Sequence, residues 1–292
     1  MALLRISAIS FLNTAPLMWD FENEGASGPL KSQFSFTYTI PSHCAEELKS
    51  GKTDIGIIPV AAYTTIPDLV IIPNVAIASK NRVRSILLVS KVPLDKIRSV
   101  ATDHSSRTSA ALVEVYLRKF VGVNPGFVEQ KPALEEMLRW HDAAMLIGDP
   151  ALQARTGGYY VYDLAEEWHR WTCLPFVFAF WAIRKAALKT ASVDVNVVRA
   201  FQQSRDHGLQ HIPEIANAWA PRLGLQVNTV GDYLTQNIDY SLDSENLEGL
   251  RLFYRYAAEC KVLPQAPELC FVPATQGSST DREQSIPSAS GA

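Results

Sequence analysis

The fold of this chain is decided by the stretch Thr102-Asp103-His104-Ser105-Ser106-Arg107-Thr108-Ser109. A short strand, residues 100–102, leads into it. Beyond it, apolar residues recur at the i, i+3, i+4 and i+7 positions of one helix face, as Val113, Tyr116, Leu117 and Phe120. The pattern predicts a strand that passes through a hydroxyl-rich turn into a helix over residues 107–120, which is the basic unit of an α/β fold.

The start of this helix is a candidate anion site. Ser105 or Ser106 can serve as the N-cap, and the free N–H groups of the first turn then favour negative charge. No P-loop lysine follows, and the glycine pattern that cradles nucleotide phosphates is missing. A small carboxylate therefore fits better than a nucleotide, and an ordinary helix cap without a ligand is the competing interpretation.

The same alternation of strand and helix runs through the first part of the chain. Apolar or alternating runs predict strands over residues 3–9, 34–40 and 54–59. Ser42 is expected to cap a helix that Gly51 ends, and a further helix is expected near Val60. Asn13 then falls in the loop after the first strand, where side chains are free to face a ligand.

The pattern starts again after an apolar segment at residues 84–90. Strands are predicted over 127–129 and 143–148, a helix over 133–140, and Asp149 and Pro150 read as the N-cap and first residue of the next helix. A second long apolar segment follows at 176–183, and four helices are predicted over 197–205, 212–223, 230–236 and 247–259. Residues from Ala274 onward lack apolar periodicity, which predicts disorder.

Two α/β modules joined by two extended segments predict two lobes, the second inserted into the first. Lobe 1 is expected to comprise residues 1–86 and 180–272, lobe 2 residues 87–179, and residues 273–292 a disordered tail. Ligands bind open α/β sheets at the carboxyl ends of the strands. Such ends are predicted at Asn13, Pro59-Val60, Ser106-Arg107-Thr108 and Gly148-Asp149. The sequence therefore predicts a small-molecule site between the lobes.

Composition excludes several other classes of protein. The 292 residues are 47% hydrophobic and 20% charged with a net charge of −3, which gives no electrostatic case for binding nucleic acid or a membrane surface. No run of 18 apolar residues exists, and Arg5 interrupts the apolar N-terminus, so a strand is expected there rather than a secretory signal. The four cysteines form no CxxC pair, which favours free thiols in a cytoplasmic protein and argues against zinc.

Five motifs together resemble one known family. They are Ser10-Phe11-Leu12-Asn13-Thr14-Ala15-Pro16-Leu17, Asp54-Ile55-Gly56, Ser105-Ser106-Arg107-Thr108-Ser109, Leu146-Ile147-Gly148-Asp149 and Trp171-Thr172-Cys173-Leu174-Pro175-Phe176-Val177-Phe178-Ala179. In order and spacing they are similar to the MqnA-type chorismate dehydratases (MqnA/MqnD family) of the futalosine route to menaquinone, over roughly residues 3–272. Cys173 stands where the family tends to have glycine, and His104 is outside the family pattern.

The resemblance implies a fold and a reaction. The fold is that of type 2 periplasmic solute-binding proteins, with a mixed, mostly parallel sheet flanked by helices in each lobe and the ligand cleft between them. The reaction converts chorismate to 3-[(1-carboxyvinyl)oxy]benzoate and water, without a cofactor or a metal ion. The only partner implied is the small-molecule substrate, and the oligomeric state is left open.

The implied site combines three candidate catalytic residues with a set of substrate contacts. Asn13, uncharged, is expected to hold a carboxylate or the leaving hydroxyl, and Ser85 to donate to the enolpyruvyl carboxylate. Asp149 takes or relays a proton, or is a plain N-cap. The expected substrate contacts are Ser10, Pro59, Val60, Ser106, Arg107, Thr108, Ser109, Gly148 and Phe176. Arg107 pairs with a substrate carboxylate or forms a surface ion pair.

Two questions stay open at the level of sequence. The base is either the substrate's own enolpyruvyl carboxylate or Asp149. The alternative functions are a non-catalytic binding protein for a small carboxylate, since the same fold serves transport, and the related dihydroxynaphthoate synthase, which would need a catalytic base in the cleft.

Overall fold

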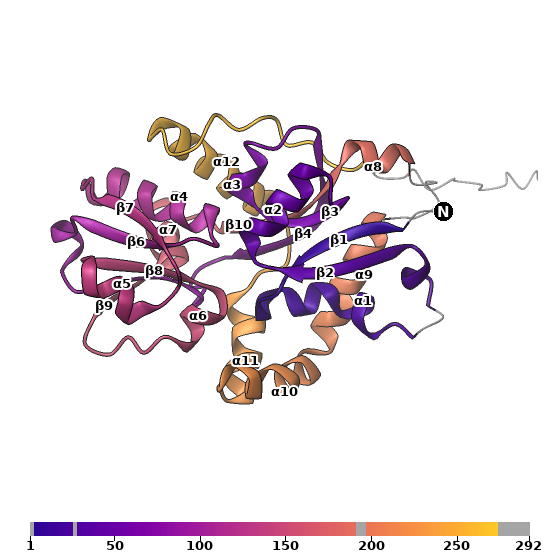
Figure 1. Cartoon of the computed structure of the whole chain (residues 1–292), viewed down its shortest axis with the longest axis horizontal. Helices are drawn as coiled ribbons and strands as arrows, with labels where there is room; N and C mark the ends of the chain where they lie inside the picture. Colours follow the sequence, from indigo (N-terminus) through magenta and orange to yellow (C-terminus); the bar gives the residue numbers. More distant parts are fainter. Residues whose placement is uncertain (1–2, 26–27, 191–196, 274–292) are drawn as a thin grey trace, which may run out of the picture.

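The computed structural model describes residues 3–25, 28–190 and 197–273, which form two lobes side by side (Figure 1). The first five-stranded sheet has the order β2-β1-β3-β10-β4, with β1 Leu4–Ile9, β2 Phe34–Thr39, β3 Ile55–Pro59, β4 Leu69–Ser79 and β10 Phe176–Arg184. The second has the order β7-β6-β8-β5-β9, with β5 Ile86–Ser90, β6 Ser99–Asp103, β7 Gly126–Gln130, β8 Ala143–Ile147 and β9 Tyr160–Asp163. The predicted disordered tail from residue 274 lies outside the described residues.

Helices flank both sheets. Those that surround the first sheet are α1 Trp19–Asn23, α2 Pro41–Ser50, α3 Val60–Tyr63, α8 Lys185–Thr190, α9 Val197–Gln210, α10 Ile212–Leu223, α11 Val227–Asp232 and α12 Ser244–Glu259. Those of the second are α4 Arg107–Val115, α5 Leu134–Trp140, α6 Gly148–Gln153 and α7 Leu164–Thr172. Short 3-10 turns are η1 Leu12–Met18, η2 Leu30–Ser32 and η3 Leu94–Lys96, and π-helical turns are η4 Tyr116–Val121 and η5 Tyr233–Asn237.

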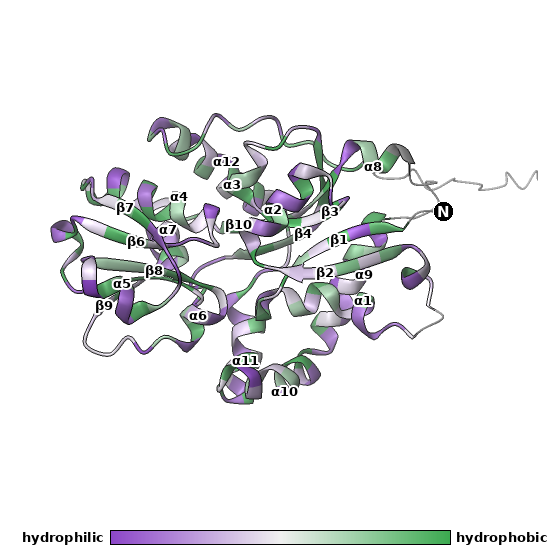
Figure 2. Cartoon of the chain, in the orientation of Figure 1, coloured by the Kyte–Doolittle hydropathy of each residue, from purple (hydrophilic) through white to green (hydrophobic). Residues whose placement is uncertain are grey.

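Burial explains why the apolar runs became strands. Every residue of β3, β5 and β8 is buried, and Figure 2 shows apolar residues along the strands of both sheets. β1 pairs in parallel with β2 and β3, and β6 in parallel with β7 and β8. β10 is antiparallel to β3 and β4, and β5 is antiparallel to β8 and β9. Helices flank sheets whose inner strands β3, β5 and β8 are buried on both faces, so the predicted two-lobed α/β class is confirmed.

The chain passes between the lobes twice. It leaves the first sheet after Ser79 and enters the second at Ile86, and it returns to the first sheet at Phe176. The apolar segment 176–183 is therefore an inner strand of the first sheet, because β10 pairs with β4 along one edge and with β3 along the other. The segments that carry the chain across are 80–85 and 173–175. The lobe limits after residues 86 and 179 stay a prediction.

Several local features differ from the sequence prediction. α2 starts at Pro41 with Ile40 in the N-cap position, so Ser42 is not the cap, whereas Gly51 ends the helix with a φ of 77° as predicted. α6 starts at Gly148, so Asp149 is not its N-cap either. The predicted helix 107–120 is α-helical to Val115 and continues as the π-helical turn η4. No helix of the described residues has the length and apolarity needed to cross a membrane.

Candidate functional site

A cavity lies where the two lobes meet, at the carboxyl ends of β1, β3 and β8. Its volume is about 50 Å³, room for a few water-sized molecules. Both lobes contribute to the wall, and the predicted site residues that line it are Asn13, Pro59, Ser85, Ser106, Thr108, Ser109 and Gly148. Apolar side chains that the prediction did not include complete it, among them Phe11, Ile77, Ile86 and Phe178. The polar side chains in this wall are all uncharged, being hydroxyl and amide groups.

Four of the nine predicted substrate contacts lie away from this cavity, and three of these four are uncharged. Ser10 donates its N–H to the carbonyl of Thr39 and borders a neighbouring cavity of about 230 Å³. Val60 is fully buried. Phe176 is also buried and packs against Trp168 and Phe253, because it sits at the start of β10 inside the aromatic core.

Arg107 and Asp149, the two charged residues of the predicted site, also lie outside the cavity wall, and each makes a contact between the lobes. The guanidinium of Arg107 pairs with the carboxylate of Glu46 on α2, an exposed contact between the lobes. The Oδ1 of Asp149 in lobe 2 accepts a hydrogen bond of 3.0 Å from the N–H of Leu12 in lobe 1. Neither side chain lines the cavity, since each is engaged across the boundary between the lobes.

The hydroxyl-rich turn also bridges the lobes. Ser106 is the N-cap of α4, and its Oγ accepts from the N–H of Ser109 at 3.1 Å. The Oγ1 of Thr108 accepts from the N–H of Ala61 in lobe 1, again at 3.1 Å, and the carbonyl of Ser105 accepts from the N–H of Ser42. A hydroxyl that accepts in this way keeps its own proton, so Ser106 and Thr108 can still donate to a ligand.

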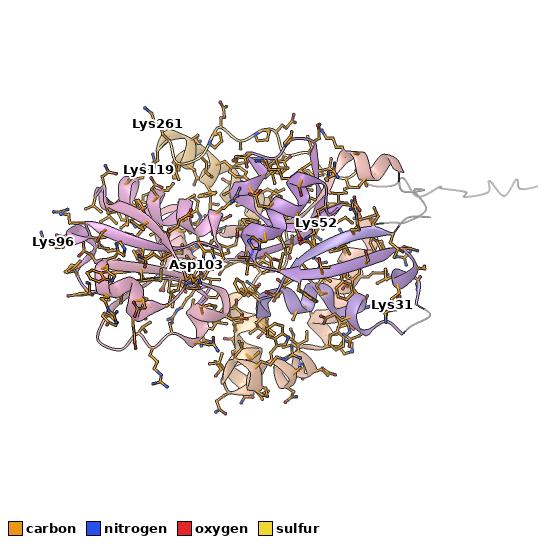
Figure 3. All side chains as sticks on the ribbon, viewed as in Figure 1. Lys31, Lys52, Lys96, Asp103, Lys119 and Lys261 are labelled. Atoms are coloured by element: carbon orange, nitrogen blue, oxygen red, sulfur yellow. The ribbon has the colours of Figure 1, made fainter. Side chains whose placement is uncertain are left out.

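Asp103 holds this turn in shape from inside lobe 2, where Figure 3 labels it. Its side chain is fully buried, and its Oδ1 accepts from both the N–H and the hydroxyl of Ser105, at 2.9 and 2.7 Å. The backbone carbonyl of Asp103 accepts from the N–H of Ser106. Asp103 therefore fixes the residues from which α4 starts.

Ser85 lies on the segment that joins the lobes, and a buried carboxylate holds this segment in place. Asp163 accepts from the N–H groups of Val83 and Arg84, at 3.1 and 2.6 Å, and it also caps α7. The carbonyl of Ser85 accepts from the N–H of Gly148 at 2.8 Å. Asp163 is not among the residues predicted from sequence, although its position three residues before Glu166 is an N-terminal capping pattern.

Tyr233 is hydrogen-bonded to two of the predicted catalytic residues, Ser85 and Asn13, and the charge of the third, Asp149, acts on it. Its hydroxyl donates to the Oγ of Ser85 at 2.9 Å, and its side chain is buried, 1% exposed. Burial raises the pKa of Tyr233, the hydrogen bonds with Ser85 and Asn13 oppose this rise, and the negative charge of Asp149 adds to it. No pattern in the sequence pointed to Tyr233, because it lies 148 residues from Ser85.

The side-chain amide of Asn13 presents an unpaired hydrogen-bond acceptor where it lines the cavity. Its Oδ1 is buried and has no hydrogen-bond partner among the described residues. A buried acceptor without a partner costs about 1–3 kcal/mol, so a ligand that donates to this oxygen would recover that free energy. The site therefore presents an acceptor at Asn13 and hydroxyl donors at Ser85, Ser106 and Thr108.

Burial raises the pKa of Asp149 from 3.8 to about 6, and the hydrogen bond from Leu12 opposes this rise. Ionisation of this group therefore destabilises the folded protein. This destabilisation is absent well below the unfolded pKa of 3.8, grows as the pH rises from there to about 6, and is constant above that. In the described residues, no group of three or more His, Cys, Asp and Glu side chains could hold a metal ion.

We expect Asp149→Asn to stabilise the protein at about pH 8 by roughly 1–3 kcal/mol, because asparagine keeps an acceptor for Leu12 and cannot ionise. The gain should shrink on acidification from about pH 6 and vanish well below pH 3.8, where the wild-type carboxyl group is protonated in both states. Melting curves of both proteins across this range provide the measurement. A gain that is the same at every pH would contradict this account of Asp149.

Two comparisons of sequence bear on the family of the chain. A family model described as menaquinone biosynthesis matches residues 4–259. A chorismate dehydratase of Thermus thermophilus is 30% identical over 275 residues, which cover 88% of this chain and 94% of that protein. A chorismate dehydratase of Campylobacter jejuni is 25% identical over 261 residues, 87% of this chain and 96% of its own.

Solved structures share the fold at low sequence identity. A protein of Archaeoglobus fulgidus superimposes with a TM-score of 0.71 at 16% identity, over 89% of this chain and 97% of the other. The periplasmic aliphatic sulphonate binding protein of Escherichia coli gives 0.63 at 16% identity, over 91% and 95%. These likenesses identify the two-lobed architecture of binding proteins. Because the family model spans most of its length, the chain belongs to the menaquinone biosynthesis family.

Proposed function

We propose that this protein is a chorismate dehydratase, a hydro-lyase that converts chorismate to 3-[(1-carboxyvinyl)oxy]benzoate and water. The observation that carries the proposal is that a 30% identical chorismate dehydratase aligns with 88% of this chain and 94% of its own. The uncharged, hydrogen-bonding wall of the cavity between the lobes supports it. We further propose that the reaction serves the futalosine route to menaquinone, takes place in the cytoplasm and needs no cofactor.

The reaction needs orientation more than it needs a strong base. The proton is lost from the ring carbon that bears the enolpyruvyl ether, and this carbon is conjugated through a ring double bond to the ring carboxylate. Loss of that proton and of the neighbouring hydroxyl group, together one molecule of water, leaves an aromatic ring. The protein has to hold the substrate, accommodate charge that spreads into the ring carboxylate, and assist the departing hydroxyl group.

The polar wall of the cavity suits these tasks. Ser106 and Thr108, at the start of α4, offer hydroxyl donors to one substrate carboxylate, and the helix dipole favours its negative charge. Ser85 offers a donor to the enolpyruvyl carboxylate. The free Oδ1 of Asn13 offers an acceptor to the leaving hydroxyl group before it departs. The cavity has room for only a few waters, so the lobes must separate to admit chorismate and close again around it.

The base in this proposal is the enolpyruvyl carboxylate of the substrate. It is covalently attached beside the reacting carbon, so proton transfer to it gains from proximity. Asp149 is the competing candidate, but its carboxylate already accepts from Leu12 and does not line the cavity. The dihydroxynaphthoate synthase alternative needs a protein base in the cleft, which this cavity wall does not contain within the described residues.

The test is to incubate the purified protein with chorismate and to follow the products by ultraviolet absorption and mass spectrometry. A dehydratase gives an aromatic product that is lighter than chorismate by one water, whereas spontaneous breakdown is measured in a sample without protein. Binding of chorismate in a calorimeter without conversion would favour a non-catalytic binding protein. If the protein neither binds nor converts chorismate, the proposal is overturned altogether.

A further inference from the structure

The π-helical turn η5 holds the segment that joins the lobes at two points. Tyr233, its first residue, donates to the Oγ of Ser85 at 2.9 Å. Asn237, its last residue, donates through Nδ2 to the carbonyl of Arg82, also at 2.9 Å. Residues four apart lie on nearly the same face of this turn, so both side chains reach the same extended segment. Ser85 is thus fixed by an element that lies 148 residues further along the chain.

The hydrogen bond from Tyr233 decides what Ser85 can do. A phenol is a better proton donor than an alcohol, so the Tyr233 hydroxyl donates and the Ser85 oxygen accepts. The hydrogen of the Ser85 hydroxyl must then point elsewhere. Ser85 is 1% exposed and lines the cavity, which leaves the cavity as the direction in which its proton can be donated.

We propose that Tyr233 is a positioning residue for the dehydration: by donating to Ser85 it directs the Ser85 proton toward the carboxylate of the bound substrate. Tyr233 does not line the cavity, so it acts through Ser85 and not by touching the substrate. This inference rests on the proposed function, because it assigns a role within that reaction. It also explains why a tyrosine hydroxyl is buried at a point where phenylalanine would fill the same space.

The experiment is a double-mutant cycle on turnover of chorismate, with Tyr233→Phe, Ser85→Ala and the two changes together. Tyr233→Phe removes one hydroxyl group and should lower kcat roughly tenfold with little change in KM, the size of one lost hydrogen bond. In the Ser85→Ala background the same change should have almost no further effect, because the group through which Tyr233 acts is already missing.

Tyr116→Phe is the matched control. Tyr116 also opens a π-helical turn, is 2% exposed, and donates its hydroxyl to a partner, the Oε2 of Glu167 at 2.7 Å, away from the cavity. The Tyr116→Phe variant therefore loses the same hydroxyl oxygen from a similarly buried position, and its kcat should equal that of the wild type. Melting curves of all variants check that the fold is kept. If Tyr233→Phe does not fold, Tyr233→Met, which fills the space with a flexible apolar chain, replaces it in the cycle.

The outcomes separate this inference from the proposed function. If the wild-type protein does not dehydrate chorismate, both proposals fall. If the wild type is active and Tyr233→Phe lowers kcat as strongly in the Ser85→Ala background as in the wild type, Tyr233 has only a general structural role and the inference alone is overturned. Loss of activity in Tyr116→Phe of the same size would overturn it as well.

Discussion

Asn13→Asp is expected to lower the turnover of chorismate by at least about a hundredfold, the effect of removing one group that stabilises developing charge. The substitution keeps the shape of the side chain and replaces an amide by an acid. Asn13 lies beside the hydroxyl of Tyr233, and the charge of Asp149 already acts on that hydroxyl. A second carboxylate here would repel the enolpyruvyl carboxylate that we propose as the base and would displace it from the reacting carbon.

The pH dependence of this variant provides a sharp readout. Burial and the nearby negative charges raise the pKa of the introduced acid, so acidification protonates it and removes the repulsion. The activity deficit should therefore shrink as the pH falls from about 8 toward 5. Asn217→Asp, on the exposed surface of α10, changes the net charge equally and should leave turnover unchanged.

One combination of results would reverse the assignment of the base. If Asp149→Asn abolishes turnover and Asn13→Ala leaves it intact, the proton goes to the protein and not to the substrate. The structure favours loss of turnover in the Asn13 variant and not in the Asp149 variant, because the Asp149 carboxylate already accepts a hydrogen bond from the N–H of Leu12 in the other lobe.

The parts of the fold that were predictable from sequence are those with a strong local signal. Runs such as 55–59 and 143–147 are apolar at almost every position, and burial on both faces of a sheet requires that. β4 was missed because Pro73 and Asn74 interrupt its apolar residues, and Asn74 has a φ of 59° there. α7 was missed because the capping pattern at Asp163 was overlooked.

The site was predictable as far as strand ends determine it. Asn13, Ser106 and Gly148 follow the carboxyl ends of β1, β6 and β8, and these three line the cavity. Side-chain direction was not predictable, because it depends on partners from the other lobe. Asp149 illustrates this. The Asp-Pro pair predicts the start of a helix, yet the Asp149 carboxylate does not cap that helix and accepts a hydrogen bond from the N–H of Leu12, 137 residues away. Tyr233 reaches the site only through tertiary packing.

Gly148→Ala is expected to reduce turnover by about a hundredfold, because a misplacement of about 1 Å at a reacting centre has an effect of that size. Gly148 has a φ of 58°, and a Cβ added there would lie 2.5 Å from the Cδ2 of Phe11. Phe11 belongs to lobe 1 and Gly148 to lobe 2, and both line the cavity. The clash can be relieved only if the ring of Phe11 moves or the lobes stay apart, and either change disturbs the closed site.

Gly122→Ala separates this effect from the cost of the backbone conformation. Gly122 has a φ of 81° in the same lobe, and a Cβ there would meet no atom within 4 Å in the described part of the chain. Both variants place alanine in a left-handed conformation, which costs roughly 1–2 kcal/mol of stability. If contact between Phe11 and Gly148 is what completes the site, both variants should melt earlier but only Gly148→Ala should lose turnover and affinity. Equal activity of the two variants would show that the reaction does not depend on close approach of the lobes at Gly148.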